Sequence, residues 1–410
     1  MRGFQDRLEV SRFQQLVRER VGLQANDPAW IERAELANCA GCVLAEPIRS
    51  TVDVPSFVRS AMDGYALRSE ETFGASAYNP LKFKVIGEVT PGRTFPGTVS
   101  PGQAVRIMTG APLPAGADAV LMAEVTREAD GVMEALDAVP PRKNTGRIGE
   151  DIRAGDAVLP AGRRLRPQDV GVLASIGVAS VAVRRKPSVT LLVTGNELLK
   201  PGQMPRGAMI VDSNSLMLAA LVERDGGAIA EILHLPDDRE RIREAMLHAP
   251  GDLLVTTGGT SVGVEDHAPV LIGELGELLV HGVAMRPSAP TGFGWVNGRP
   301  VFLLPGNPVS CLAAYDFFVG LAVRRLGGRA DAWPYRQKPF PLRDRISSQI
   351  GRVDYARVRI ESGQAVLLAT SGASILSTTT QADGFVVVDQ DSEGFAAGDT
   401  VAVWLYDEQS

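Results

Sequence analysis

Cysteine, histidine and aromatic residues are scarce in this chain of 410 residues, which has three cysteines, four histidines and 6% aromatic side chains. Three cysteines cannot form the disulfide framework of a secreted protein, and an odd number suits a reducing compartment. Cys39 and Cys42 form a CxxC pair, but no second pair or neighbouring histidine completes a zinc site. A disulfide scaffold is therefore excluded, and the role of the CxxC pair stays open.

The chain also lacks long apolar runs and an excess of basic residues. Its longest apolar stretches have the length of strands and its charged N-terminus has no signal-peptide core, so we expect a cytoplasmic protein without a membrane segment. The formal net charge of −6 argues against nucleic acid as a partner. A hydrophobic content of 45% is ordinary for a globular protein, and the length predicts several domains of roughly 100–150 residues each.

Apolar periodicity and glycine turns divide the first half of the chain. Apolar side chains recur at helical spacing from Arg7 to Val21, and Trp30 to Leu44 offers a second amphipathic segment, which predicts a helical beginning. Short strands broken by Gly and Pro indicate a compact β domain over residues 51–140. We assign residues 1–50 and 141–185 to one split helical and linker domain around it.

Residues 186–329 alternate strands and helices, as a doubly wound α/β domain does. The predicted strands are 189–193, 229–235, 253–255 and 301–304, and the predicted helices are 215–224, 239–248 and 309–326. Residues 330–410 begin with a Pro-rich linker and continue as short strands between glycine turns, which predicts a second all-β module, a small barrel. The fold class is therefore multidomain α/β with added β domains.

The segment DLLVTTGGTSVGVEDH, residues 252–267, carries the strongest functional signal. A buried strand runs into Gly258 and Gly259, which let the backbone approach a ligand closely. The hydroxyl donors around them are Thr256, Thr257, Thr260 and Ser261. Asp266 then adds a carboxylate to a loop otherwise suited to an anion, which makes sense where a divalent cation lies between the two.

Parallel sheets bind ligands at the carboxyl ends of their strands, and four loops of the α/β domain stand there. They are TGNEL (194–198), PDD (236–238), TTGGTSVGVED (256–266) and LPGNPVS (304–310). Together they bring the carboxylates of Glu197, Asp237, Asp238 and Asp266 toward one edge of the sheet. Mg²⁺ takes oxygen ligands and would let a phosphorylated ligand bind beside these acids. The alternative is that the acids only cap loops and helices.

Pro305 and Pro308 stiffen the LPGNPVS turn, which the strand-end rule also lets face a ligand. Three loops outside the α/β domain are weaker signals. SAMDGYA (60–66) and GED (149–151) place Asp63 and Asp151 in glycine turns, and Thr109 ends a strand in RIMTGAPLPAG. Asp-Gly pairs are common in turns, so each of these loops means little by itself.

Taken in order, SAMDGYA, RIMTGAPLPAGADAV, GEDI, TGNEL, VDSN, TTGGTSVG and LPGNPVS resemble the molybdopterin molybdenumtransferase family, which includes MoeA and the E domain of gephyrin. The resemblance runs from Leu36 to Trp404. It implies a four-part subunit: a split helical region around a β domain, a molybdopterin-binding α/β domain and a C-terminal β barrel. It also implies an elongated homodimer whose cleft joins the α/β domain of one subunit to the split N-terminal region of the other.

The resemblance further implies an activity. Members of the family insert molybdate into adenylylated molybdopterin with Mg²⁺ and release AMP, and the pterin dithiolene supplies the metal's sulfur ligands, so no cysteine cluster is needed. By motif, Asp63, Thr109 and Asp151 would line the wall from the partner subunit, and Glu197, Asp238 and Asp266 would hold Mg²⁺ and pyrophosphate. The residues that would shape the substrate side are Thr257, Gly258, Gly259, Ser261, Pro305 and Pro308. A molybdopterin adenylyltransferase and recipient molybdoenzymes are the implied partners.

The chain departs from the family mainly in its basic residues. Where the family reads NIR before GED, this chain has Asn144, Thr145 and Gly146, with Arg147 one place later. Where it reads KPGKP, residues 286–290 are RPSAP, so Arg286 keeps a cation and Ala289 removes one. Arg147 and Arg286 are the candidates for binding the substrate's oxyanions. Each lost charge-assisted hydrogen bond costs on the order of 1.5–3 kcal/mol.

Gly146 and Ala289 leave two alternatives open beside the insertion reaction. One is a catalytically weakened paralogue that binds the pterin cofactor as a carrier or assembly factor. The other is an insertase that prefers tungstate, because tungstate and molybdate share shape and charge. The sequence also leaves open which carboxylate handles protons.

Overall fold

The computed structural model describes residues 7–259 and 266–407 and divides the chain into two compact units. Unit 1 holds Met1–Glu32 and Val183–Ser410, and unit 2 holds Arg33–Ala182. The four-domain division expected from the sequence stays a prediction. No helix among the described residues is long and apolar enough to span a membrane.

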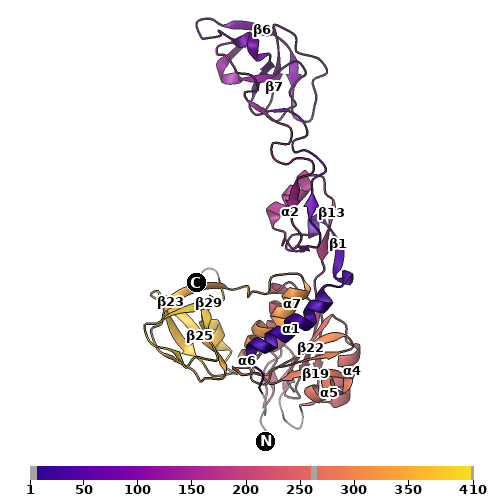
Figure 1. The fold of residues 1–410 in the computed structure, drawn as a ribbon, viewed down its shortest axis with the longest axis vertical. Helices are drawn as coiled ribbons and strands as arrows, with labels where there is room; N and C mark the ends of the chain where they lie inside the picture. The colour runs from indigo at the N-terminus through magenta and orange to yellow at the C-terminus, as the bar shows by residue number, and fades with distance from the viewer. Residues whose placement is uncertain (1–6, 260–265, 408–410) are drawn as a thin grey trace. The chain divides into compact units, whose positions relative to one another are not determined.

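The centre of unit 1 is a six-stranded sheet in the order β17–β14–β18–β22–β21–β19, of which Figure 1 labels β22 and β19. Four neighbouring strands are parallel, namely β17 (Ala228–Leu235), β14 (Ser188–Thr194), β18 (Leu253–Thr257) and β22 (Arg299–Leu304). The strands β21 (Gly292–Val296) and β19 (Gly276–His281) continue the sheet in antiparallel pairing. The expected α/β sheet is thus confirmed, with an antiparallel edge.

Helices cover both faces of this sheet, which explains why its middle strands β14, β18 and β22 are buried along almost their whole length. Leu253 and Val255 belong to one hydrophobic cluster and Leu254, between them, to another. The second cluster contains side chains of α4 (Arg239–His248) and α5 (His267–Leu275). The first contains side chains of α1 (Val10–Ala25), α3 (Asn214–Arg224), α6 (Pro308–Ala314) and α7 (Gly320–Leu326).

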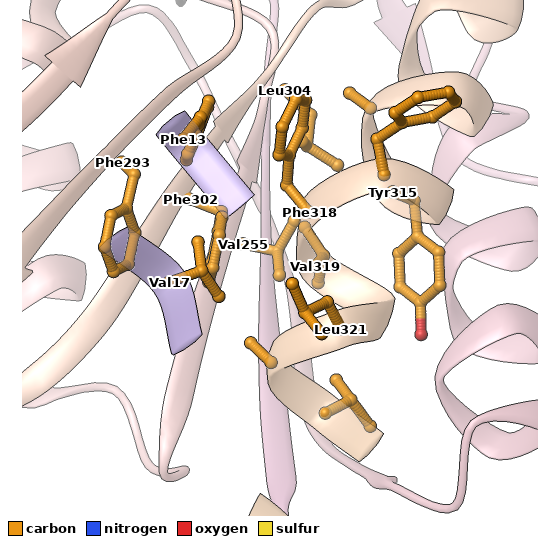
Figure 2. Packing of buried hydrophobic residues seen from close by; sticks show 14 of the residues in the cluster. Phe13, Val17, Val255, Phe293, Phe302, Leu304, Tyr315, Phe318, Val319 and Leu321 are labelled. Atoms are coloured by element: carbon orange, nitrogen blue, oxygen red, sulfur yellow. The ribbon is translucent and has the colours of Figure 1, made fainter. Parts of the chain in front are cut away.

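The first face is built largely from aromatic rings. Phe13 of α1 stacks on Phe318, with ring centroids 4.0 Å apart, and Phe293 stacks on Phe302 at 4.7 Å (Figure 2). Phe318 lies in a π-helical segment, Tyr315–Val319, between α6 and α7. The sequence predicted one regular helix over 309–326, which is wrong in this middle segment because side-chain periodicity does not report a widened backbone turn.

The C-terminal part of unit 1 is β-rich, as expected. Its main sheet contains β23 (Arg336–Pro341), β25 (Val353–Glu361), β26 (Gln364–Ala369), β27 (Gly384–Val388) and β29 (Thr400–Leu405). The short strand β20 (Met285–Arg286) of the α/β part pairs in parallel with β25. The smaller elements of unit 1 are β15 (Leu198–Leu199), β16 (Ile210–Val211), β24 (Ile346–Ser347), β28 (Gly394–Phe395) and α8 (Ser377–Gln381).

Unit 2 contains a six-stranded sheet in the order β8–β5–β7–β6–β10–β9, built from short strands as the sequence predicts. These strands are β5 (Gly64–Leu67), β6 (Leu81–Val89), β7 (Gln103–Ile107), β8 (Ala119–Met122), β9 (Thr126–Ala129) and β10 (Val132–Ala135). Two short pairs accompany the sheet, β4 (Arg59–Ser60) with β11 (Thr145–Gly146), and β3 (Ile48–Arg49) with β12 (Ala157–Leu159). Unit 2 also contains helix α2 (Pro167–Ser175).

The link between the units corrects one expectation. The predicted helix within 30–44 does not form, and Ile31–Glu35 is instead strand β1. It pairs with β13 (Ser180–Arg184), which also pairs with β2 (Val43–Leu44). The partner that makes β1 a strand is distant in the sequence, so local periodicity could not reveal it.

Candidate functional site

A cavity of about 550 Å³ opens at the carboxyl ends of β14, β18 and β22, where the strand-end rule predicts a ligand site. Its walls come from the loop after each of these strands, from β16 and the start of α3, and from two more distant turns. The polar lining residues are Thr194, Glu197, Asp212, Ser213, Asn214, Thr257, Asp266, Asn307 and Ser374. The other residues that shape it include Gly258, Gly259, Pro290, Pro305, Gly306 and Pro308.

Glycines allow the strand-end loops to lie against one another. Gly258 has φ +87°, and a Cβ placed there would lie 2.2 Å from the carbonyl oxygen of Thr194. A Cβ on Gly306 would lie 3.6 Å from the Cα of Gly258. The loops after β14, β18 and β22 therefore form one continuous backbone surface, and only glycine fits at position 258.

The VDSN segment organises one side of the cavity. Asp212 Oδ1 accepts the backbone N–H groups of Asn214 at 2.9 Å and Ser215 at 3.1 Å, so Asp212 caps the start of α3. Its other oxygen lies 2.9 Å from Nε2 of His234. The sequence did not reveal that Asp212 and Asn214 also face the cavity. The available signals were the position of VDSN between a strand and a helix and its place among the motifs of the family resemblance.

The predicted acidic residues do not all lie in the cavity. Glu197 and Asp266 line it. Asp238 is not among the described lining residues, and its Oδ1 accepts the backbone N–H of Arg241 at 2.9 Å as the N-cap of α4. Asp237 Oδ2 accepts the backbone N–H of Asn196 at 3.0 Å, which ties PDD to TGNEL. Ser261 lies outside the described residues.

Among residues 7–259 and 266–407, no group of three or more His, Cys, Asp and Glu side chains is close enough to hold a metal ion. Mg²⁺, however, commonly binds through one or two carboxylates and completes its shell with water and substrate phosphates. Glu197 and Asp266, which line the same cavity, supply a donor set of that kind. The residues present therefore fit Mg²⁺ that binds together with a phosphorylated substrate.

Positions 286 and 289, which correspond to the two lysines of KPGKP, do not bring a cation to the cavity. Arg286 forms an ion pair with Asp354, whose side chain is fully buried and also accepts from Ser348 Oγ at 2.9 Å. This pair reinforces the β20–β25 contact between the α/β and C-terminal parts. No Lys or Arg is among the described residues that line the cavity. Arg286 therefore serves packing between these parts, and Ala289 leaves its own position uncharged.

In unit 2, the predicted residues Asp63 and Thr109 are directly bonded. Asp63 Oδ1 accepts the backbone N–H of Thr109 at 2.7 Å and its hydroxyl at 2.8 Å. These two bonds lower the pKa of Asp63 below its ordinary value, so the carboxylate stays charged in weak acid. Asp151 is exposed in the same unit, and the backbone N–H of Arg147 donates to Glu150 Oε2 at 2.9 Å.

A cation lies beside Gly146 that sequence reasoning did not identify. Gly146 pairs with Arg59 between β11 and β4, and a Cβ on Gly146 would lie 3.1 Å from both Cγ and Nε of Arg59. Arg59 Nη2 binds Glu150 Oε1 at 2.7 Å. The ion pair of Arg59 and Glu150 thus occupies the place into which a side chain at 146 would extend, because such a Cβ would also lie 2.8 Å from Glu150 Oε1. The only sequence signal was a basic residue directly before SAMDGYA.

Three family models match successive parts of the chain. The MoeA N-terminal region (domain I and II) matches residues 8–177, a probable molybdopterin binding domain matches residues 190–325, and the MoeA C-terminal region (domain IV) matches residues 339–406. The second match covers the sheet, apart from the first two residues of β14, and most of the residues that line the cavity.

Whole-length relatives agree with these matches. The chain is 35% identical over 373 residues to a molybdopterin molybdenumtransferase of Staphylococcus aureus, with 88% of each chain covered. It is 32% identical over 403 residues to a putative molybdopterin biosynthesis protein of Methanocaldococcus jannaschii, with 96% of each covered. A crystal structure of the molybdopterin biosynthesis MoeA protein from Pyrococcus horikoshii superimposes with a TM-score of 0.82 at 33% identity and covers 98% of this chain and 100% of that one. The chain therefore belongs to the MoeA family of molybdopterin molybdenumtransferases.

Proposed function

We propose that this protein inserts molybdate into adenylylated molybdopterin in a Mg²⁺-dependent reaction that releases AMP. The observation that carries the proposal is the cavity at the carboxyl ends of β14, β18 and β22. There, closely packed glycine loops suit a phosphate and a flat ring system, and the carboxylates of Glu197 and Asp266 border the same space. The names of the curated relatives support the same substrate class.

The cavity residues divide the work. Glu197 and Asp266 would hold Mg²⁺, which when bound neutralises the charge of the pyrophosphate. The sequence also assigns Asp238 to the metal, but its bond to the backbone at the N-cap of α4 favours a structural role. The residues assigned to the pterin side are Thr257, Gly258, Gly259, Ser261, Pro305 and Pro308. Their backbone and ring surfaces would orient the substrate and exclude water.

Asp63, Thr109, Arg147 and Asp151 belong to the same proposal as the second wall of a cleft in a homodimer. The hydrogen bonds from Thr109 keep Asp63 ionised and oriented, which suits a carboxylate that acts on substrate. A cytoplasmic location and handover between a molybdopterin adenylyltransferase and recipient molybdoenzymes complete the proposal.

A second candidate function is a pterin-cofactor carrier with weak catalysis. It is favoured by one observation: the described lining of the cavity contains no Lys or Arg, because Arg286 is engaged with Asp354 and position 289 is alanine. An oxyanion would then bind weakly, whereas the pterin would still bind well.

One assay separates the two. Purified protein given adenylylated molybdopterin, molybdate and Mg²⁺ should release AMP, and Asp63→Ala and Asp266→Ala should each stop the release. Glu231→Ala, which removes an exposed carboxylate of β17 outside the described cavity lining, is the matched control and should leave it unchanged. Tight pterin binding by the unmutated protein without AMP release would establish the carrier instead. Tungstate in competition with molybdate decides the oxyanion.

A further inference from the structure

The side chain of Asn214 joins two substrate-facing loops. Its Nδ2 donates to the carbonyl oxygen of Gly306 at 2.7 Å and to Oγ1 of Thr257 at 3.0 Å. Thr257 ends β18, and Gly306 lies in the PGN turn after β22. A single amide at the first residue of α3 therefore bridges the ends of two neighbouring strands.

The orientation of this amide is fixed by its partners. A carbonyl oxygen can only accept, so the nitrogen of the Asn214 side chain must face Gly306 and the oxygen must face away. Asn214 is 7% exposed, and its Oδ1 is buried with no hydrogen-bond partner among the described residues. Buried side-chain oxygens usually accept a hydrogen bond, so the unpaired Oδ1 is an energetic cost. The two bonds made by Nδ2 are therefore the reason we assign to this side chain.

The start of α3 is itself held rigidly, so the amide has a fixed base. Asp212, 4% exposed, accepts the backbone N–H groups of Asn214 and Ser215 and contacts His234 of β17 through its second oxygen. This links Asn214 to the strand at one edge of the parallel part of the sheet. The Asn214 side chain thus holds both loops to the capped start of α3, and not only to each other.

We propose that Asn214 is a positioning residue for the reaction of this cavity: its amide sets the spacing between the TTGG and PGNP loops to that required by the bound substrate. The inference rests on the proposed function, since it takes the cavity as the substrate site. A displacement of about 1 Å in a loop that positions substrate can cost on the order of 100-fold in rate.

The test compares three variants at adjacent positions. Asn214→Ala removes the amide, and Asn214→Asp keeps its shape but places an acceptor against the Gly306 carbonyl. Ser215→Ala is the matched control, because Ser215 is 1% exposed in the same turn and its Oγ has no partner within the described part of the chain. Both Asn214 variants should lose roughly 10-fold to 100-fold in kcat/KM. Ser215→Ala should stay within twofold of the unmutated enzyme, roughly the scatter of unaffected sites.

A double-mutant cycle separates positioning from general damage to the fold. Thr257→Val removes one of the two amide contacts, so Asn214→Ala should cost less in the Thr257→Val background than in the unmutated enzyme. Additive losses, or a loss equal to that of Ser215→Ala, would overturn the proposal.

A measurement without turnover keeps the inference apart from the proposed function. Amide hydrogen exchange should quicken in both loops, at residues 256–259 and at Gly306, Asn307 and Val309, in Asn214→Ala and in neither loop in Ser215→Ala. If the unmutated protein releases no AMP but this exchange pattern appears, the proposed function fails and the loop linkage stands. If AMP is released and neither exchange nor kcat/KM responds to Asn214, the inference fails alone.

Discussion

The two ends of the parallel strands in unit 1 differ in how fully their buried polar groups are hydrogen-bonded. At the amino end, Asp252 accepts from both terminal nitrogens of Arg185, at 2.6 and 2.7 Å, and from the N–H and hydroxyl of Ser188, at 2.8 and 2.6 Å. At the carboxyl end, Thr194 Oγ1 and Asn214 Oδ1 are buried without a hydrogen-bond partner among residues 7–259 and 266–407. Strand β14 runs from one arrangement to the other.

This difference indicates that polar groups at the amino end of the sheet stabilise the fold, whereas those at the carboxyl end are available for binding. Burial alone would raise the pKa of Asp252, but the hydrogen bonds from Arg185 and Ser188 hold it below its ordinary value. That carboxylate is used entirely by the protein itself. The acids of the cavity, Glu197 and Asp266, border open space that a ligand can occupy. The amino end should therefore respond to mutation in stability, and the carboxyl end in activity.

The largest effect is expected at the carboxyl end. Glu197→Gln keeps the size of an exposed side chain and removes one charge from the proposed metal site. We expect turnover to fall on the order of 100-fold or more, with the free energy of unfolding changed by less than about 0.5 kcal/mol. AMP release and urea unfolding of the same preparation measure the two. A stability loss as large as the activity loss would erase the contrast between the ends.

The opposite pattern is expected for Asp252→Ala. Removal of the carboxylate leaves Arg185 and Ser188 without their shared acceptor, and the pair is only partly exposed, so the free energy of unfolding should fall by about 2–3 kcal/mol. Turnover per folded molecule should be retained. Urea unfolding with a parallel activity assay checks both, and Asp252→Asn should fall between the two proteins.

The same variant predicts a pH dependence. Because the pKa of Asp252 is lowered in the folded state, its contribution is complete above the unfolded pKa of about 3.9 and is lost as the pH falls through the lower, folded value. Asp252→Ala should therefore lose less stability than the unmutated protein on acidification. Parallel curves in that range would contradict this assignment.

A smaller activity effect is expected in unit 2. If Arg59 supplies the cation that position 146 lacks, Arg59→Ala should raise KM for adenylylated molybdopterin roughly tenfold, the value of one charge-assisted hydrogen bond. Arg68→Ala is the matched control, since Arg68 also forms an exposed ion pair in unit 2. An unchanged KM in Arg59→Ala would show that Arg59 does not replace the cation that position 146 lacks.

The smallest effect is expected at Asp238, which tests whether a predicted metal ligand is a helix cap. Asp238→Ala should cost about 1 kcal/mol of stability, and Asp238→Asn only a few tenths because asparagine caps equally well. Turnover should be the same in Asp238→Asn as in the unmutated enzyme. A loss of turnover in Asp238→Asn would restore Asp238 to the metal site.

Much of this arrangement could be predicted because the informative patterns were local. The strands of the α/β domain follow from short apolar runs, and β18 matches the predicted strand with Thr256 and Thr257 added. The predicted strand-end loops after β14, β18 and β22 do meet at one cavity. Capping by Asp212 could likewise be read from residue type and position.

The rest depended on partners that sequence periodicity does not contain. Ile31–Glu35 is a strand because β13 pairs with it, and Ser374 reaches the cavity from the C-terminal part of unit 1. Arg286 has the charge expected of a residue that binds an anion, but it forms an ion pair with the buried carboxylate of Asp354. Residue type thus located the acids and glycines of the site, whereas the use of each charge was decided by tertiary contacts.

The pairing of β1 with β13 makes unit 2 an insertion in topological terms. The chain leaves unit 1 along β1 and re-enters it along β13, and these two strands are paired. Beside them, the backbone N–H of Arg185 donates to the carbonyl oxygen of Trp30 at 3.0 Å. A short turn could therefore replace Arg33–Ala182 without opening the sheet that carries the cavity. Such an excised chain would test whether Asp63 and its neighbours add to what the cavity binds by itself, as the proposed function requires.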